Sequence, residues 1–383
     1  MFCPTEFHWW HRALWQRKDK IDDSCRSRGT EPGLHVRSNF CNIRGCMSFQ
    51  IGNVTLKHGI MLAPMAGVTD YAFRRLSIQC GAEYTVSEMV SAKAMHYRDE
   101  KTATLARIRQ GELPMAIQIF GSEPDIMAEA AQMLESGNYR GCVSDLPPSA
   151  IDINMGCPVR KIVTNGEGSA LMKNPTLVYD IVKEVTKAVS IPVTVKIRAG
   201  WDASHKNAVE IALAAEEAGA TALTVHGRTR EQMYQPPVDY EIIARVKDAL
   251  HIPVIANGGI NTADDALWVK KETGCDGIMV ARGAEGNPML FAEIRAAFEG
   301  TPYQKPSSKE LLGLAREHIA LLCEDKGESI GVREARKHLA WYVKGIRGAA
   351  SFRQAVNSTW TLDSLLRLID ELEATLDIPE IQE

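Results

Sequence analysis

The chain has 383 residues, of which 45% are hydrophobic and 24% are charged, so it can bury a large core and form one large domain with a smaller one. Its formal net charge of −4 excludes a uniformly basic surface, although a local basic patch can be hidden in that balance. The nine cysteines form no CxxC pair and no zinc-type spacing, so we expect reduced thiols rather than a disulfide framework or a metal site.

Residues 1–46 show no steady hydrophobic period and hold four of the nine cysteines. We interpret this segment as a disordered extension, or as the product of a start codon set too early, with Met47 as the true start. No secretory apolar core follows the start, and no run approaches the ~20 apolar residues that span a bilayer. We therefore expect a cytoplasmic protein without a membrane partner, and nothing in the sequence indicates an obligate protein partner.

From Met47 onward, short apolar runs alternate with amphipathic helical patterns. The predicted strands are 60–63, 83–86, 115–119, 150–154, 192–197, 221–226, 253–257 and 277–281. The predicted helices are 70–79, 98–108, 124–136, 175–189, 207–218, 239–250, 262–273 and 288–298. Apolar strands that alternate with helices indicate a parallel sheet covered on both faces. The pattern therefore predicts an α/β fold, a (β/α)8 TIM barrel over residues 47–302.

An open, doubly wound sheet is the alternative to the barrel. Against it, no GxGxxG follows the first strand, which continues instead as APMAGVTD. A change of composition at 300–308, GTPYQKPSS, ends the alternation. Beyond it we predict only helices, over 308–326, 330–347, 349–357 and 360–375, and therefore a small all-helical C-terminal domain at 307–383.

In a (β/α)8 barrel the catalytic residues lie at the carboxyl ends of the strands. The chemically capable or glycine-bearing residues at these positions are Pro64, Met65, Ala66, Gln118, Asn154, Cys157, Lys196, Arg198, His226, Asn257, Gly258, Gly259, Ala281, Arg282 and Gly283. The loops after the last two strands both contain glycine, and barrels commonly bind phosphate there. We therefore expect a phosphate site at 257–259 and 281–283, whereas two ordinary barrel turns are the alternative.

Two of these side chains remain ambiguous when taken alone. Lys196 fits a salt-bridge partner, a Schiff-base nucleophile or a cation beside a flavin ring. Cys157, between Gly156 and Pro158 in DINMGCPVRKI, fits either a catalytic thiol or a small buried hydrophobe.

The segments LAPMAGVTDYAFRRL, DINMGCPVRKI, GSALMKNP, VKIRAGW, TVHGRTREQMY, IPVIANGGI and RKHLAWYVKGI resemble the flavin-dependent tRNA-dihydrouridine synthases of the bacterial B-type subgroup. The resemblance runs in order from about residue 55 to 350. It implies an enzyme that uses NADPH to reduce FMN and then reduces the C5=C6 bond of a uridine in tRNA.

The resemblance also implies roles for individual residues. Pro64, Met65 and Ala66 would lie along the flavin ring, Gln118 and Lys196 would bind its polar edge, and His226 would lie near the ring and its phosphate arm. Asn154 and Arg198 would contact the uracil. The phosphate would be held by Asn257, Gly258, Gly259, Ala281, Arg282 and Gly283.

The same resemblance implies an unusual role for Cys157. Hydride from FMN would add to C6 of the uracil, and Cys157 would deliver a proton to C5. Its thiol would then have to stay protonated and act as a general acid, whereas most catalytic cysteines act as thiolates. Two other functions stay open beside this one, a Schiff-base aldolase-type barrel using Lys196 and a noncatalytic RNA-binding barrel.

Residues 331–353 contain six Lys or Arg and one acid. On a continuous helix, at about 100° per residue, the cations Arg333, Arg336, Lys337, Lys344 and Arg347 would form one stripe. Solvated helix faces usually mix the two signs of charge. We therefore predict that Arg336, Lys337 and Lys344 contact tRNA phosphates, while an ordinary solvated face is the alternative.

Overall fold

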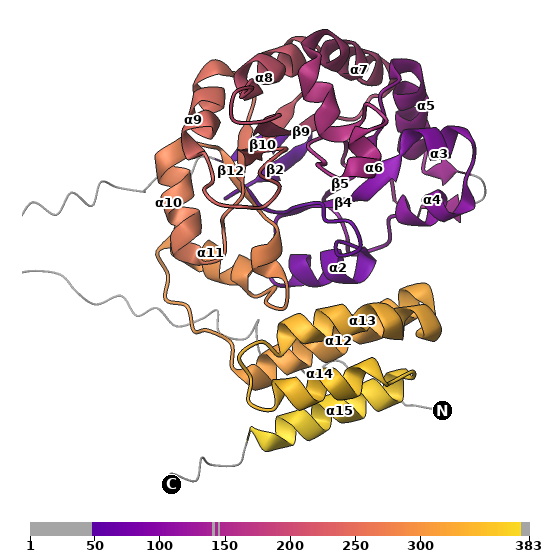
Figure 1. Cartoon of the computed structure of the whole chain (residues 1–383), viewed down its shortest axis with the longest axis vertical. Coiled ribbons are helices and arrows are strands. Elements are labelled where there is room, and N and C mark those ends of the chain that lie inside the picture. Colours follow the sequence, from indigo (N-terminus) through magenta and orange to yellow (C-terminus); the bar gives the residue numbers. More distant parts are fainter. Residues whose placement is uncertain (1–47, 140–141, 145, 377–383) are drawn as a thin grey trace, which may run out of the picture. The chain divides into compact units, whose positions relative to one another are not determined.

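A computed structural model describes residues 48–139, 142–144 and 146–376 of the chain (Figure 1). The predicted N-terminal extension at 1–46 lies outside the described residues. Eight parallel strands form a closed barrel in the order β10-β11-β12-β3-β4-β5-β8-β9. Within the described residues, no helix has the length and apolarity needed to cross a membrane. The predicted (β/α)8 barrel is therefore confirmed, and the open-sheet alternative is wrong.

The barrel strands agree with the predicted apolar runs. The largest difference is at β4, which was predicted at 83–86 and continues to residue 91 in the structure. The bounds of the strands are β3 Ile60–Leu62, β4 Tyr84–Ser91, β5 Met115–Phe120, β8 Ala150–Met155, β9 Val193–Gly200, β10 Ala222–Thr229, β11 Val254–Asn257 and β12 Gly277–Val280. A short antiparallel hairpin, β1 Phe49–Ile51 and β2 Val54–Leu56, precedes them.

Helices surround the strands (Figure 1). They are α2 Tyr71–Gln79, α3 Ala92–His96, α4 Glu100–Leu105, α5 Pro124–Glu135, α6 Arg160–Val163, α7 Pro175–Ala188, α8 Ala208–Glu217, α9 Tyr240–Ala249, α10 Ala263–Thr273 and α11 Leu290–Glu299. The helix predicted at 98–108 is wrong in extent, because two short helices occupy 92–105. Arg98 separates them with a φ of 62°, a left-handed conformation that no α-helix can contain.

The barrel interior has an apolar layer and a polar layer. Near the amino ends of the strands, inward residues such as Met61, Tyr84, Ala116 and Ile255 form an apolar cluster with Ile51 and Leu56 of the hairpin. Alternate residues along a strand share one face, so the next inward positions after Ala116 and Ile255 are Gln118 and Asn257. The polar side chains therefore lie above a filled apolar floor, toward the carboxyl ends of the strands.

The C-terminal region consists of helices α12 Ser308–Lys326, α13 Glu328–Tyr342, α14 Ala349–Asn357 and α15 Leu362–Thr375. Their apolar faces form one core, and Ala72 and Leu76 of α2 belong to it. The expected all-helical composition is confirmed. The helix predicted at 330–347 is too long, because α13 ends at Tyr342, and Gly345 and Gly348 follow with φ values of 84° and 83°.

Two histidines are buried where α12 and α13 pack against α2. The rings of His318 and His338 have centroids 4.3 Å apart, and Phe73 of α2 stacks on His318 at 5.5 Å. Burial lowers the pKa of His318 to about 4, with the nearby charge of Asp70 opposing this shift and the cations Lys326 and Lys337 adding to it. His318 is therefore neutral in the folded protein well below the pH at which an unfolded histidine becomes protonated.

Acid should destabilise this packing before it protonates His318 in the folded state. Because the folded pKa lies below the unfolded value near 6.5, the stabilising contribution is complete above pH 6.5 and is lost as the pH falls toward 4. Between pH 6.5 and pH 5 the loss in unfolding free energy from this residue should be about 2 kcal/mol. Urea denaturation at pH 7 and pH 5 measures it.

The substitution His318→Gln should reduce this pH dependence, since glutamine takes up no proton. His251→Gln is the matched control, because the His251 side chain is 97% exposed. This substitution should leave the pH dependence of the unfolding free energy unchanged. If the wild type and His318→Gln lose the same unfolding free energy between pH 7 and pH 5, His318 is not the source of the pH dependence.

Candidate active site

Six of the predicted site residues lie on neighbouring barrel strands, toward the carboxyl ends: Gln118, Asn154, Lys196, Arg198, His226 and Asn257. Strand pairing aligns Asn154 of β8 with Lys196 of β9, and His226 of β10 with both Arg198 of β9 and Asn257 of β11. Gln118 of β5 aligns with Asp152 of β8, which aligns in turn with Thr194 of β9. The register therefore brings residues from five strands together without help from any loop.

The loop that carries Cys157 is held by several hydrogen bonds. The backbone N–H groups of Gly156 and Cys157 donate to Asn154 Oδ1, at 3.1 and 2.9 Å. Arg198 Nε donates to the Gly156 carbonyl at 2.6 Å, and Ser169 Oγ donates to the Cys157 carbonyl at 2.9 Å. Both sides of the Gly156–Cys157 segment are therefore fixed to the barrel.

The Cys157 thiol is half-buried and its pKa is raised. Loss of water around the sulfur is the largest cause, and a backbone N–H of Val159 and the charge of Arg198 oppose it only in part. The thiol is therefore protonated at neutral pH. A nucleophilic cysteine requires the opposite shift, so this environment favours a proton donor.

Lys196 lies in the interior, and its Nζ donates to Asn257 Oδ1 at 3.0 Å. Asn257 Nδ2 donates in turn to the Met279 carbonyl at 2.7 Å, which fixes the orientation of the amide. Burial lowers the pKa of Lys196 to about 7, the charge of Arg198 adds to this shift, and Asp152 opposes it. Lys196 is thus a half-buried donor whose charge changes near neutral pH.

The glycine-bearing loops after β11 and β12 form a narrow backbone cradle. Gly258 and Gly259 have φ values of 111° and 77°, which side-chain-bearing residues rarely adopt. A Cβ on Gly258 would lie 2.8 Å from the His226 ring, and a Cβ on Gly283 would lie 2.3 Å from the Ile260 carbonyl oxygen. Glycine at these positions therefore lets the two loops and the His226 ring pack closely together.

Cationic side chains surround this cradle. Arg282 is exposed, and its guanidinium lies 4.7 Å from the centre of the Tyr234 ring. Arg228 is buried, with Nε donating to the Gln235 carbonyl at 2.8 Å and Nη1 3.3 Å from His226 Nε2. Burial, followed by the charges of Lys196, Arg198, Arg228 and Arg282, lowers the pKa of His226 well below its usual range, so His226 is neutral.

Sequence reasoning missed Arg228 and Asp152. Arg228 comes two residues after His226 on β10, and Asp152 comes two residues before Asn154 on β8. The two-residue period of a strand places each on the same face as its predicted neighbour, and that signal could have identified both.

The predicted flavin loop after β3 is held from two directions. Pro64 and Met65 are half-buried and Ala66 is exposed. At Gly67, the N–H donates to a Glu88 carboxylate oxygen of β4, and the carbonyl accepts from Lys337 Nζ of α13. Burial is the main cause that raises the pKa of Glu88. Lys337 therefore contacts the barrel loop.

The predicted single stripe of cations on one helix is wrong. Since α13 ends at Tyr342, Lys344 and Arg347 lie outside the helix that carries Arg333, Arg336 and Lys337. Arg336 Nη2 donates to the Thr359 carbonyl at 2.8 Å, and its guanidinium lies 4.7 Å from the centre of the Trp360 ring. Arg333, Lys344 and Arg347 are exposed.

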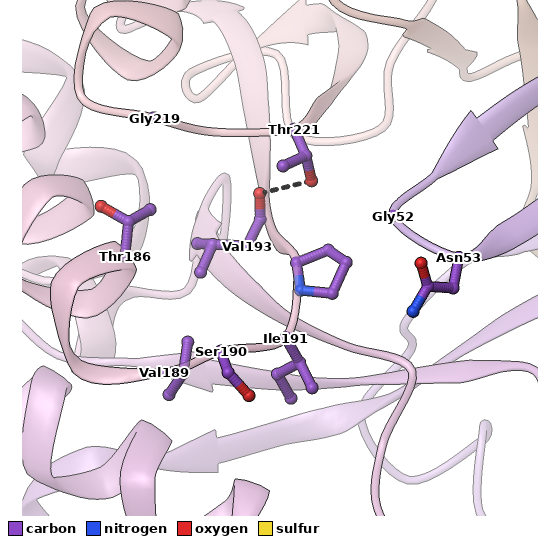
Figure 2. A pocket seen from close by; sticks show the side chains of 10 residues that line it. Gly52, Asn53, Thr186, Val189, Ser190, Ile191, Val193, Gly219 and Thr221 are labelled. Carbon is purple, nitrogen blue, oxygen red and sulfur yellow. Dashed lines mark hydrogen bonds between the residues drawn. The ribbon is translucent and has the colours of Figure 1, made fainter.

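An open pocket of about 310 Å³ lies at the other end of the barrel, where β9 and β10 begin (Figure 2). It is lined by the β1–β2 turn at Gly52 and Asn53 and by residues 189–193, and Thr221 Oγ1 donates to the Val193 carbonyl at 3.1 Å. None of the predicted site residues lines it. Among the described residues, no group of three His, Cys, Asp or Glu could hold a metal ion.

Comparison with known proteins identifies the family. The family model described as dihydrouridine synthase matches residues 61–377. The tRNA-dihydrouridine synthase B of Vibrio parahaemolyticus is 41% identical over 331 residues, which cover 86% of this chain and 98% of that protein. The protein of the same name from Pasteurella multocida is 43% identical over 311 residues, covering 81% and 91% of the two chains.

A solved structure of 2-naphthoyl-CoA reductase shares only the fold. It has a TM-score of 0.51 and 14% sequence identity, and the match covers 67% of this chain and 52% of the reductase. The family model, in contrast, extends over the barrel and all four C-terminal helices, α12 to α15. The chain therefore belongs to the dihydrouridine synthase family.

Proposed function

We propose that this protein reduces the C5=C6 bond of a uridine in tRNA, with FMN as its flavin and NADPH as the reductant. The observation that carries the proposal is the Cys157 thiol just beyond the carboxyl end of β8, on a loop that Asn154, Arg198 and Ser169 hold by hydrogen bonds, in a chain of the dihydrouridine synthase family. The relatives named tRNA-dihydrouridine synthase support tRNA as the substrate. A cytoplasmic location follows from that substrate.

The residues of the site fit a flavin mononucleotide. The glycine cradle at 257–259 and 281–283, with Arg282 beside it, suits a phosphate group. The buried Gln118 and the half-buried Lys196 offer N–H donors to the polar edge of a flavin ring, and the half-buried Pro64 and Met65 offer an apolar surface. A cation near that polar edge stabilises a reduced, anionic ring, and the charge of Lys196 suits this role.

The chemistry that FMN would supply when bound is the hydride that adds to C6 of the uracil. Negative charge then develops at C5 and O4 of the base. Cys157 donates the thiol proton to C5, its S–H bond breaks as the new C–H bond forms, and solvent returns a proton to the sulfur. The raised pKa keeps the proton on the thiol until the base becomes basic enough to take it.

Arg198 and Asn154 are proposed uracil contacts that also build the loop. Arg198 uses Nε on the Gly156 carbonyl and Nη1 on the carbonyls of Thr229 and Met233. One Asn154 N–H donates to Gln118 Oε1 at 2.7 Å, and the amide nitrogen lies 3.7 Å from Met89 Sδ. A uracil carbonyl could replace this weak sulfur contact, so Asn154 can bind the base without releasing Cys157.

The pKa of Lys196 is also compatible with the alternative function, an aldolase-type barrel that forms a Schiff base. A pKa of about 7 is the property that a Schiff-base lysine requires. That alternative gives a colourless protein that borohydride traps covalently with its substrate, and a noncatalytic RNA-binding barrel gives no NADPH oxidation. Membership in a family of synthases favours the flavin enzyme over both, and a yellow protein with flavin absorbance bands would support that choice.

The substitution Cys157→Ala should abolish most uridine reduction and keep flavin and tRNA binding. Loss of a general acid costs about 10²- to 10⁴-fold in rate. Stopped-flow absorbance should show normal flavin reduction by NADPH, because the thiol acts only on the uracil. Single-turnover formation of dihydrouridine measures the loss.

Cys323→Ala is the matched control for this experiment. Cys323 is a buried free thiol in α12, so its removal should leave dihydrouridine formation unchanged. Near-normal single-turnover rates in Cys157→Ala would refute the assignment of Cys157 as the acid.

The C-terminal region should bind tRNA through its exposed cations. Arg333, Lys344 and Arg347 form no ion pair with any described residue, unlike Lys326, which is paired with Asp70 and Glu334. Replacing the three exposed cations with glutamine should weaken tRNA binding and reduce the log–log salt slope by about one for each phosphate that is no longer neutralised. Binding isotherms at several salt concentrations give the slope.

Arg336 and Lys337 should be replaced in a separate variant. Their side chains bond to the carbonyls of Thr359 and Gly67, so replacing them also removes contacts within the protein. Lys57→Gln is the surface control, since Lys57 precedes the amino end of β3, away from the proposed site, and its side chain is 69% exposed. An unchanged slope in the triple variant would mean that tRNA is held elsewhere.

A further inference from the structure

A chain of hydrogen bonds runs through the polar layer from Asp152 to the Cys157 loop. Thr194 Oγ1 donates to Asp152 Oδ1 at 2.6 Å, and Gln118 Nε2 donates to Asp152 Oδ2 at 2.7 Å. Asn154 Nδ2 donates to Gln118 Oε1 at 2.7 Å. Asn154 Oδ1 then accepts the N–H groups of Gly156 and Cys157.

Each link determines the orientation of the next. An ionised carboxylate only accepts hydrogen bonds, so Asp152 requires the Nε2 end of Gln118 to face it. The Gln118 oxygen must then face Asn154, which turns the Asn154 nitrogen toward Gln118 and its oxygen toward the loop. If the amides were reversed, Asn154 would present N–H groups to two backbone N–H groups, which cannot bond to each other.

Burial makes these orientations costly to lose. Asp152 is 3% exposed, Gln118 is 1% exposed and Asn154 is 8% exposed. An unpaired buried polar group loses the full free energy of its hydration, so the chain has no inexpensive alternative arrangement. The direction set at Asp152 is therefore transmitted to the backbone of Cys157.

Asp152 has no direct salt-bridge partner among the described residues that would explain its burial. Lys196 Nζ bonds to Asn257 rather than to Asp152, and it affects Asp152 only through its charge. Immediately beneath Asp152 the interior is apolar, with Ala150 of the same strand in the lower cluster. A carboxylate at this boundary is expensive, yet both of its oxygens are used to order neighbouring side chains.

We propose that Asp152 is a positioning residue for Cys157. Asp152 orients the Gln118 and Asn154 side chains, and Asn154 in turn holds the backbone N–H of Cys157 in place. The inference rests on the proposed role of Cys157 as the proton donor, because only then does the aim of this thiol limit uridine reduction. Asp152 itself touches neither the thiol nor the reacting atoms.

A double-mutant cycle tests the connection without relying on turnover. The full chain with its flavin bound, and without tRNA, is treated with iodoacetamide, and alkylation of the peptide that contains Cys157 is followed by mass spectrometry. Asp152→Ala should speed alkylation about tenfold, which corresponds to a fall of one unit in the thiol pKa, because the released loop admits water. Asn154→Ala should have a similar effect.

The decisive measurement is the double variant Asp152→Ala/Asn154→Ala. If Asp152 acts through Asn154, the double variant should react no faster than Asn154→Ala alone. If the rate increases of the two single variants multiply in the double variant, the proposal is overturned, because Asp152 would then act on Cys157 independently of Asn154. Unchanged alkylation in the Asp152 variants would overturn it as well.

Two further variants separate positioning from general destabilisation. Thr194→Val removes the other hydrogen bond to Asp152 and leaves the link to Gln118, so Cys157 should react at nearly the wild-type rate. Asp152→Asn preserves size and should speed alkylation less than Asp152→Ala, and it replaces the latter in the cycle if Asp152→Ala does not fold. Equal acceleration by Thr194→Val and Asp152→Ala would support a purely structural role and contradict the proposal.

The two proposals fail in different ways. Normal uridine reduction by Cys157→Ala would remove the catalytic role of the thiol and leave the alkylation cycle interpretable. An additive cycle would exclude Asp152 as a positioning residue and leave the role of Cys157 unaffected.

Discussion

The register of the closed parallel barrel is the constraint on which the rest of the structure depends. Because neighbouring strands are parallel and in fixed register, residues that are distant in sequence share one layer of the interior. On β5 and β11 the same two-residue period places an apolar residue at the lower inward position and a polar one above it, Ala116 below Gln118 and Ile255 below Asn257. Slipping one strand by a single residue would exchange its inner and outer faces, and the polar layer would lose its members on that strand.

Local sequence patterns were sufficient to predict the eight strands of the barrel. The strands are buried on both faces and therefore appear as short apolar runs, which bounded them to within one or two residues in most cases. Helix ends were predicted less well where a backbone conformation decided them. The left-handed Arg98 divides one predicted helix, and the glycines at 345 and 348 follow the early end of α13.

The site was predictable in type but not in its internal connections. Glycine pairs, a thiol followed by proline and cations at strand ends are visible in the sequence, and the family resemblance supplied their proposed roles. Hydrogen-bond partners are not visible, because they depend on distances between strands. Sequence reasoning therefore could not show that the Lys337 ammonium contacts the Gly67 carbonyl, and it overlooked Asp152 beneath the cysteine loop.

Helix α2 belongs to two cores at once. Phe73 belongs to the main hydrophobic cluster of the barrel, while Ala72 and Leu76 belong to the cluster of the C-terminal helices. The segment between α11 and α12 separates the barrel from the C-terminal helices along the chain. The apolar surface of α2, however, is shared by both cores. Shortening the protein to its barrel would expose Ala72 and Leu76 of α2 to water, so the barrel depends on the C-terminal helices to cover that face of α2.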